Sequence, residues 1–191
     1  MFRRKFINRY LVCLFVSLIF LGYGAITLCR ANDVKYLRNN IHVQEHKNEE
    51  YRASYANWTK PGKGHIIIPV NTPVKIGNFR RGFTLVTQDS RKTILFEYDE
   101  SRMGMTEDKY IDLITSAQPI KIDDFSETDR EGIKDGKVRV GMTKDGVRIA
   151  LGYPATHKTS SLNENTWIYW TNRFKSFKVE FDEKGKVTKI Q

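Results

Sequence analysis

The chain has 191 residues, with 32 Lys and Arg against 22 Asp and Glu and a formal net charge of +10. Five of the basic residues and none of the acidic ones lie in the first 31 residues, so the remainder carries 27 against 22, or +5. This mild charge suits contact with anionic phospholipid headgroups or with an acidic protein, and it is also ordinary for a soluble domain. Nucleic acid is excluded as a partner, because no motif interleaves aromatic and basic residues.

The first 31 residues have the layout of a secretory signal sequence. A nearly unbroken apolar run over residues 11–28 follows four basic side chains, Arg3, Arg4, Lys5 and Arg9. Three fates are open to this segment: cleavage after Ala31, retention as a membrane anchor, or lipidation at Cys29. The run is close to the ~20 residues that a membrane span needs. The residue directly before a lipidated cysteine is normally small, but Leu28 occupies that position before Cys29. Export follows in each case.

Disulfide and thiolate chemistry are excluded if this segment is removed. Cys13 and Cys29 are the two cysteines of the chain, and both lie before the cleavage position. A chain cut after Ala31 therefore forms no disulfide and offers no thiolate.

Two regions lie between this segment and the C-terminal part. Residues 32–64 are polar and predict a linker with one loose helix. From residue 65 short apolar runs alternate with turn residues, at 66–68, 74–76, 83–87 and 93–98. This spacing predicts a small β-rich domain over residues 65–122, either a sheet or an SH3-like barrel, that ends in a helix.

Residues 123–191 predict an α+β domain that begins with two helices. Ser126 precedes a segment that is acidic early and basic late, as suits the helix dipole. Thr143 can cap the second helix, because the first N–H groups of a helix lack internal partners. Gly152 and Pro154 end it, since Gly suits the left-handed position and Pro lacks an N–H. One face of this helix carries Val147, Ala150 and Leu151.

The hydrophobic period then changes from about 3.6 to 2, which is typical of strands with one buried face. Residues 167–170 predict an aromatic strand, and residues 177–190 predict a hairpin that turns at 182–185. The sequence thus predicts two helices packed on a three-stranded antiparallel sheet. Much of the buried area should come from Trp167, Tyr169, Phe177 and Phe181.

The order of motifs in the last third of the chain resembles one family. The motifs are Gly141-Met142-Thr143, Val147, Leu151-Gly152-Tyr153-Pro154, Trp167-Ile168-Tyr169 and Phe181-Asp182 with Gly185 and Val187. This pattern is similar to that of the BamE (SmpA/OmlA) family of small bacterial envelope proteins.

The resemblance implies a protein that assists the insertion of β-barrel proteins into the outer membrane. Members of the family are typically lipoproteins, and they contact a barrel-assembly partner and phosphatidylglycerol. The positions that correspond by motif are Gly141, Met142, Thr143, Trp167, Tyr169 and Phe181. Structural roles in turn, cap or core are expected for Gly141, Thr143, Val147, Leu151, Gly152, Pro154, Trp167, Tyr169 and Phe181. Exposed contact with a partner or a lipid is expected for Met142, Tyr153, Trp170 and Arg173.

No catalytic site, metal site or cofactor is predicted. His42 and His46 would share one face of a helix, as a metal-binding pair does, but no third ligand has a recognisable spacing. No motif holds two carboxylates at a fixed separation, and Ser160-Ser161 lacks the context of a nucleophile elbow. The basic clusters Arg80-Arg81, Arg91-Lys92 and Arg173/Lys175/Lys178 are candidate contact patches or solvated faces.

One internal echo allows two interpretations. Residues 103–108 resemble residues 140–145 at an offset of 37, and an apolar helical stripe follows each. Either the segment is duplicated, or both copies use a common way to enter a helix.

The leading hypothesis is an exported, membrane-associated protein that acts by binding, as an accessory in outer-membrane protein assembly or envelope integrity. Its partners would be envelope proteins, among them a β-barrel assembly component, and anionic lipid. The alternative is a cell-wall or small-ligand binding protein whose site lies in residues 65–122, outside the family pattern. An enzyme is not expected.

Overall fold

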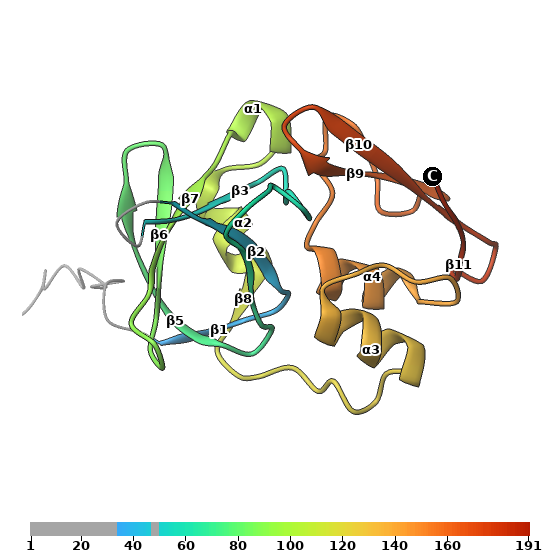
Figure 1. Ribbon diagram of the computed structural model, residues 1–191, viewed down its shortest axis with the longest axis horizontal. Coiled ribbons are helices and arrows are strands. Elements are labelled where there is room, and N and C mark those ends of the chain that lie inside the picture. The colour runs from blue at the N-terminus through green and yellow to red at the C-terminus, as the bar shows by residue number, and fades with distance from the viewer. Residues whose placement is uncertain (1–33, 47–49) are drawn as a thin grey trace, which may run out of the picture. The chain divides into compact units, whose positions relative to one another are not determined.

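The computed structural model describes residues 34–46 and 50–191 (Figure 1). The described residues belong to one compact unit, Ala31–Gln191. The expected signal sequence or anchor, with both cysteines, lies outside them. No helix among the described residues is both long and apolar enough to cross a membrane.

The α+β class is confirmed, and its largest element is a curled sheet of eight strands (Figure 1). The strand order is β4-β2-β3-β7-β6-β5-β1-β8, and every neighbouring pair is antiparallel except β3 and β7. The strands are β1 (Lys35–Leu37), β2 (Ile41–Glu45), β3 (Tyr51–Ser54), β4 (His65–Ile68), β5 (Pro73–Phe79), β6 (Gly82–Thr87), β7 (Thr93–Glu97) and β8 (Thr115–Ser116).

The core of this sheet follows from the alternation of its side chains. In β6 and β7 every second residue is buried, and the rings of Phe83 and Phe96 stack at 4.6 Å. Two helices follow β7: α1 (Glu100–Met103), which Asp99 caps, and α2 (Glu107–Ile114). Because Tyr110 and its apolar neighbours on α2 are buried against the same rings, α2 completes this core.

The segment 32–64 differs from the expected polar linker, because it supplies three strands of the sheet. Five of its apolar residues are buried, namely Leu37, Ile41, Val43, Tyr51 and Ala53, and the buried side chains of Asn40, His42 and Asn57 bond to residues far along the chain. The Asn40 side chain donates to the carbonyls of Ile133 (2.6 Å) and Ala150 (3.3 Å) and accepts from the Val70 N–H (2.8 Å). The sheet therefore draws strands from both sides of the boundary expected at residues 64 and 65.

The C-terminal region contains two helices and a three-stranded antiparallel sheet, as the sequence pattern indicates. The helices are α3 (Glu127–Asp135) and α4 (Lys144–Leu151), and the sheet has the order β11-β10-β9. Ser126 and Thr143 cap the two helices through their side-chain oxygens. The strands are β9 (Thr166–Asn172), β10 (Lys175–Phe181) and β11 (Val187–Ile190).

A buried carboxylate joins the two helix starts. Asp129 is almost fully buried and accepts hydrogen bonds from the Thr143 N–H (2.7 Å), the Thr143 hydroxyl (3.2 Å) and the Ser126 hydroxyl (2.7 Å). Gly146 lies directly against it, since a Cβ there would come within 2.1 Å of an Asp129 carboxylate oxygen. These contacts fix how α3 meets α4. Both helices contribute to a second hydrophobic core, in which Ile133, Val147 and Leu151 pack with Trp167 and Val179 of the three-stranded sheet.

Candidate functional site

Two of the four residues expected to make exposed contacts are buried, so the expectation was wrong for Met142 and Tyr153. Met142 has no exposed surface, and its sulfur accepts the Arg139 N–H at 3.1 Å. Gly132 permits this inward position, because a Cβ on Gly132 would lie 2.4 Å from the Met142 sulfur. Tyr153 is 6 % exposed, because it packs into the core of the eight-stranded sheet, which the motif pattern of the last third does not contain.

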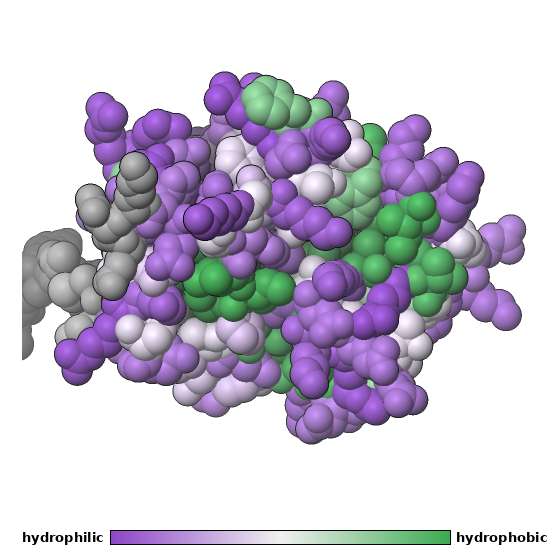
Figure 2. Space-filling view, viewed as in Figure 1, coloured by the Kyte–Doolittle hydropathy of each residue, from purple (hydrophilic) through white to green (hydrophobic). Residues whose placement is uncertain are grey.

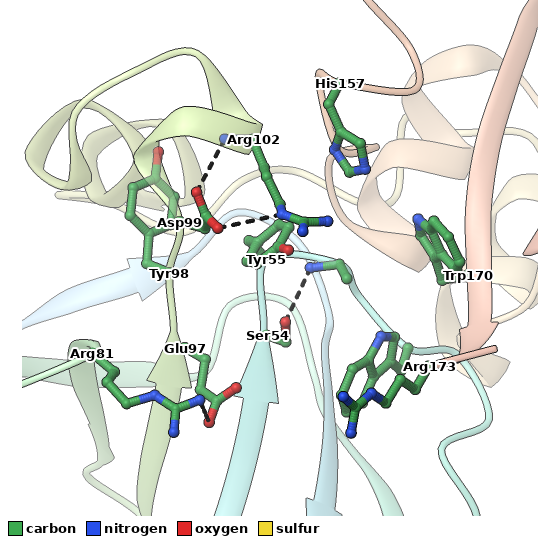
Figure 3. A pocket seen from close by; sticks show the side chains of 12 residues that line it. Ser54, Tyr55, Arg81, Glu97, Tyr98, Asp99, Arg102, His157, Trp170 and Arg173 are labelled. Carbon is green, nitrogen blue, oxygen red and sulfur yellow. Dashed lines mark hydrogen bonds and ion pairs between the residues drawn. The ribbon is translucent and has the colours of Figure 1, made fainter.

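The other two, Trp170 and Arg173, line a cavity of about 680 Å³, here called the arginine cavity. In Figure 3, Arg81, Glu97 and Tyr98 lie on one side of it, and Trp170 and Arg173 lie on the other. The cavity thus joins residues from the eight-stranded sheet to residues of β9 and its following turn.

Strand pairing explains how these residues meet. Because β3 and β7 run parallel, their carboxyl ends lie at the same edge of the sheet. Residues 54–58 follow β3 into the cavity, and residues 97–102 do so from the end of β7 through α1. The chain after β3 also runs along β9, where the N–H groups of Thr59 and Lys60 donate to the carbonyls of residues 170 and 171 at 3.0 and 2.8 Å. Backbone hydrogen bonds therefore fix the chain after β3 between two walls of the cavity, through the pairing of β3 with β7 and through the bonds of Thr59 and Lys60 to β9.

Two of the three guanidinium groups at the cavity are paired with carboxylates. Arg81 meets Glu97 at 2.9 Å, and Arg102 meets Asp99 at 3.4 Å. Asp99 also accepts from the Ser101 hydroxyl and the Arg102 N–H, and these hydrogen bonds, the hydroxyl first, hold the pKa of its carboxyl below the usual value. Both pairs are partly exposed, so they position side chains more than they stabilise the fold.

Arg173 differs from these two, since no acidic side chain among the described residues pairs with it. It is exposed, and its guanidinium lies 5.9 Å from the centroid of the Phe174 ring. An arginine keeps its charge at any physiological pH. The arginine cavity therefore has one uncompensated positive charge at its wall.

The tyrosines of the cavity are neutral. Burial raises the pKa of Tyr98 to about 12, and its hydroxyl donates to the Met105 carbonyl at 2.8 Å. Burial also raises the pKa of Tyr55. Neither phenol is suited to act as a base or a nucleophile near neutral pH, because both hold their protons.

The indole of Trp170 is half-buried, and its N–H is enclosed without an acceptor among the described residues. A buried donor without an acceptor costs stability and calls for an explanation. The nitrogen itself has almost no exposed surface, so this donor does not face the open cavity.

The histidines do not form the helical pair considered from the sequence. His42 lies in β2 and His46 directly follows it, so the segment is a strand. His42 bonds to His65, nitrogen to nitrogen at 3.1 Å, and to the Ala150 carbonyl at 3.0 Å. Among the residues that the structure describes, no three His, Cys, Asp or Glu side chains gather as a metal site would require.

A second concave region, here called the apolar groove, has a volume of about 490 Å³. One wall is β4, an edge strand of the large sheet, with His65 and Ile67. The opposite wall comes from the C-terminal region, with Val138, Phe177 and Ile190. Figure 2 shows hydrophobic residues reaching the surface in the region of β10 and β11.

The edge of the groove is basic. Lys60 and Lys137 line it, and neither forms an ion pair with a carboxylate of the described chain, whereas Asp135 is paired with Arg139 at 2.5 Å. Close by in sequence, Val140 is 62 % exposed beside Gly141, the glycine of the turn motif. An apolar groove with a basic edge is suited to binding an apolar segment that also carries acidic residues.

The basic clusters identified in the sequence separate in the structure. Arg81 and Arg173 enter the arginine cavity, but Arg80 does not line it. Lys92 folds over the Tyr51 ring and donates to its hydroxyl at 3.1 Å. Sequence reasoning missed Trp58 and Arg102 at the cavity; the available signal was a lone tryptophan in a segment interpreted as a polar linker.

Comparison with protein families adds one finding. A family model described as "Outer membrane protein assembly factor BamE domain" matches residues 135–191, from the end of α3 to the C-terminus. A search of curated proteins gave no match, and a search of solved structures gave none. The resemblance drawn from the motifs is thereby confirmed for the C-terminal third, which matches the BamE domain family.

Proposed function

We propose that this protein is exported and membrane-associated, and that it serves the bacterial envelope as an accessory in outer-membrane protein assembly or envelope integrity. Its action is binding and not catalysis. The match of residues 135–191 to a domain named for outer-membrane protein assembly is the observation that carries this proposal. The signal-like composition of residues 1–31 supports export to the periplasmic side of a membrane.

The apolar groove is the partner site in this proposal. Its occupant is an extended segment of an envelope protein, such as a barrel-assembly component. Apolar residues of this segment pack into the groove, and its acidic residues pair with Lys60 and Lys137. β4 supports an extended occupant, because an edge strand presents unpaired backbone groups that another strand can meet. The unpaired lysines support an acidic one.

In this proposal the turn between β9 and β10 contacts anionic lipid, because Met142 and Tyr153 are buried. Phe174 is 86 % exposed at this turn, and Arg173 and Lys175 flank it, both exposed. An apolar ring between two cations is suited to the headgroup layer of an anionic membrane, where the ring is buried and the cations meet phosphates.

Crosslinking in intact cells followed by purification tests the partner site. The full chain should recover an envelope protein, and the charge reversal Lys137→Glu should lower that recovery about tenfold. The matched change Lys109→Glu, at an exposed position of α2, should leave it unchanged. Equal recovery by both variants would remove the groove from the proposal.

The alternative is a cell-wall or small-ligand binding protein. The arginine cavity favours it, because five of the lining residues, at positions 81, 97, 98, 99 and 102, come from the region where this alternative places its site. Sedimentation of the full chain with purified peptidoglycan tests it. The full chain is needed, since residues 65–122 share their sheet with strands β1, β2 and β3.

A further inference from the structure

We propose that the arginine cavity binds an acidic sugar, that is, a saccharide ring bearing a carboxylate. This inference rests on the small-ligand alternative described above and names the ligand class for it. The family match does not cover most of the cavity, because nine of its twelve lining residues precede residue 135.

The polarity of the lining argues for a polar ligand. The twelve lining residues include three arginines, two carboxylates and a histidine. An acyl chain or an apolar peptide would strip water from these groups without giving them partners, which is costly. A ligand rich in hydroxyls satisfies donors and acceptors alike, because each hydroxyl can both donate and accept.

The charge of the lining argues for an anion. Glu97 and Asp99 already compensate Arg81 and Arg102. Arg173 is left without a carboxylate among the described residues, and a guanidinium can hold a carboxylate through two parallel hydrogen bonds. One unpaired arginine matches one carboxylate.

The aromatic residues argue for a ring. Trp58 and Trp170 both line the cavity and are both half-buried, so neither side chain is fully covered by the protein. A flat indole offers a large and rigid contact surface at a low cost in conformational entropy. The C–H face of a sugar ring can lie on such a surface while its hydroxyls reach the polar groups at the rim.

The size of the cavity agrees with this class. About 680 Å³ lies within the roughly 300–1,000 Å³ typical of small-molecule sites. It accommodates one or two sugar rings and is too small for a folded partner.

The test uses two disaccharides that differ by one 3-O-lactyl group, which carries the only carboxylate of the pair. The probes are N-acetylglucosaminyl-N-acetylmuramic acid and the neutral N,N′-diacetylchitobiose. The full chain is kept in a detergent without a sugar headgroup, and tryptophan fluorescence reports binding, since two of the three tryptophans line the cavity. Inorganic phosphate and glycerol 3-phosphate are titrated in parallel, so that a phosphate ligand is recognised as such.

The acidic disaccharide should bind at least about tenfold more tightly than the neutral one, as expected for one charge-assisted contact. Arg173→Gln should remove about tenfold of this affinity, whereas Lys109→Gln, which deletes one exposed charge outside the cavity, should not. Both changes lie on exposed side chains, so the fold is preserved.

Equal affinity for the two disaccharides, or equal behaviour of the two variants, overturns the proposal. Preference for either phosphate probe with loss in Arg173→Gln also overturns it, although the small-ligand function then stands with another ligand class. If no probe binds and peptidoglycan does not sediment the protein, the small-ligand function fails as well.

Discussion

Removal of the buried carboxylate of Asp129 should separate the starts of α3 and α4. Asp129→Ala deletes the acceptor of three hydrogen bonds, from the Thr143 N–H, the Thr143 hydroxyl and the Ser126 hydroxyl. The two hydroxyls can rotate toward other partners, but the Thr143 N–H is fixed by the backbone. Hydrogen bonds to a charged group contribute about 1.5–3 kcal/mol each, and they are not additive within one network.

We therefore expect Asp129→Ala to lower the free energy of unfolding by about 3 kcal/mol, measured by urea unfolding with tryptophan fluorescence. Asp129→Asn keeps an oxygen for the Thr143 N–H and should cost about 1 kcal/mol. Asp124→Ala, an exposed acidic residue in the preceding loop, should stay within about 0.5 kcal/mol of the parent. A loss below about 1 kcal/mol for Asp129→Ala, or equal losses for the alanine and asparagine variants, would show that the Asp129 carboxylate does not hold the two helix starts together.

Three further predictions concern pH, packing and lipid. Burial lowers the pKa of His42 from 6.5 to about 4, so on acidification the unfolded chain takes up a proton before the folded chain does. The free energy of unfolding should therefore fall by up to about 3 kcal/mol between pH 6.5 and 4. In urea unfolding, His42→Asn should flatten this loss, and a profile unchanged by the substitution would contradict the prediction. Gly136→Ala should lower the stability in thermal unfolding by about 2 kcal/mol more than Gly104→Ala. Both glycines have a left-handed backbone, but only a Cβ on Gly136 would clash, with Ile67 at 2.4 Å. Equal losses would show that this contact relaxes. Phe174→Ser should weaken binding to phosphatidylglycerol vesicles about tenfold with no change in stability, and unaltered flotation would exclude this turn as the lipid contact.

Much of the C-terminal region could be predicted from the sequence, because its signals are local. Ser126 and Thr143 cap helices where their spacing indicates, and the period of two after residue 166 gives three strands. The burial of Met142 could not be predicted, since it depends on Gly132 allowing the sulfur to approach α3.

The segment 32–64 shows why the rest escaped prediction. Polar residues normally indicate exposed chain, but Asn40 and His42 are buried, because their partners lie about 100 residues away, on α3 and α4. The sequence pattern contains no trace of such pairing. For the site, the same limit applies: Trp170 and Arg173 were found as contact candidates, whereas Trp58 joins them through the long-range pairing of β3 with β7 and of residues 59 and 60 with β9.

In the proposed function, the surface of the C-terminal third binds an envelope partner. A photoreactive amino acid placed at Ile190, in the apolar groove, tests it most directly in intact cells, with the same probe at exposed Lys121 as the control. We expect a crosslink from position 190 to a barrel-assembly or other envelope protein, absent from position 121 and lost when Lys137→Glu is added. Equal labelling from both positions, or no adduct from position 190, would contradict it.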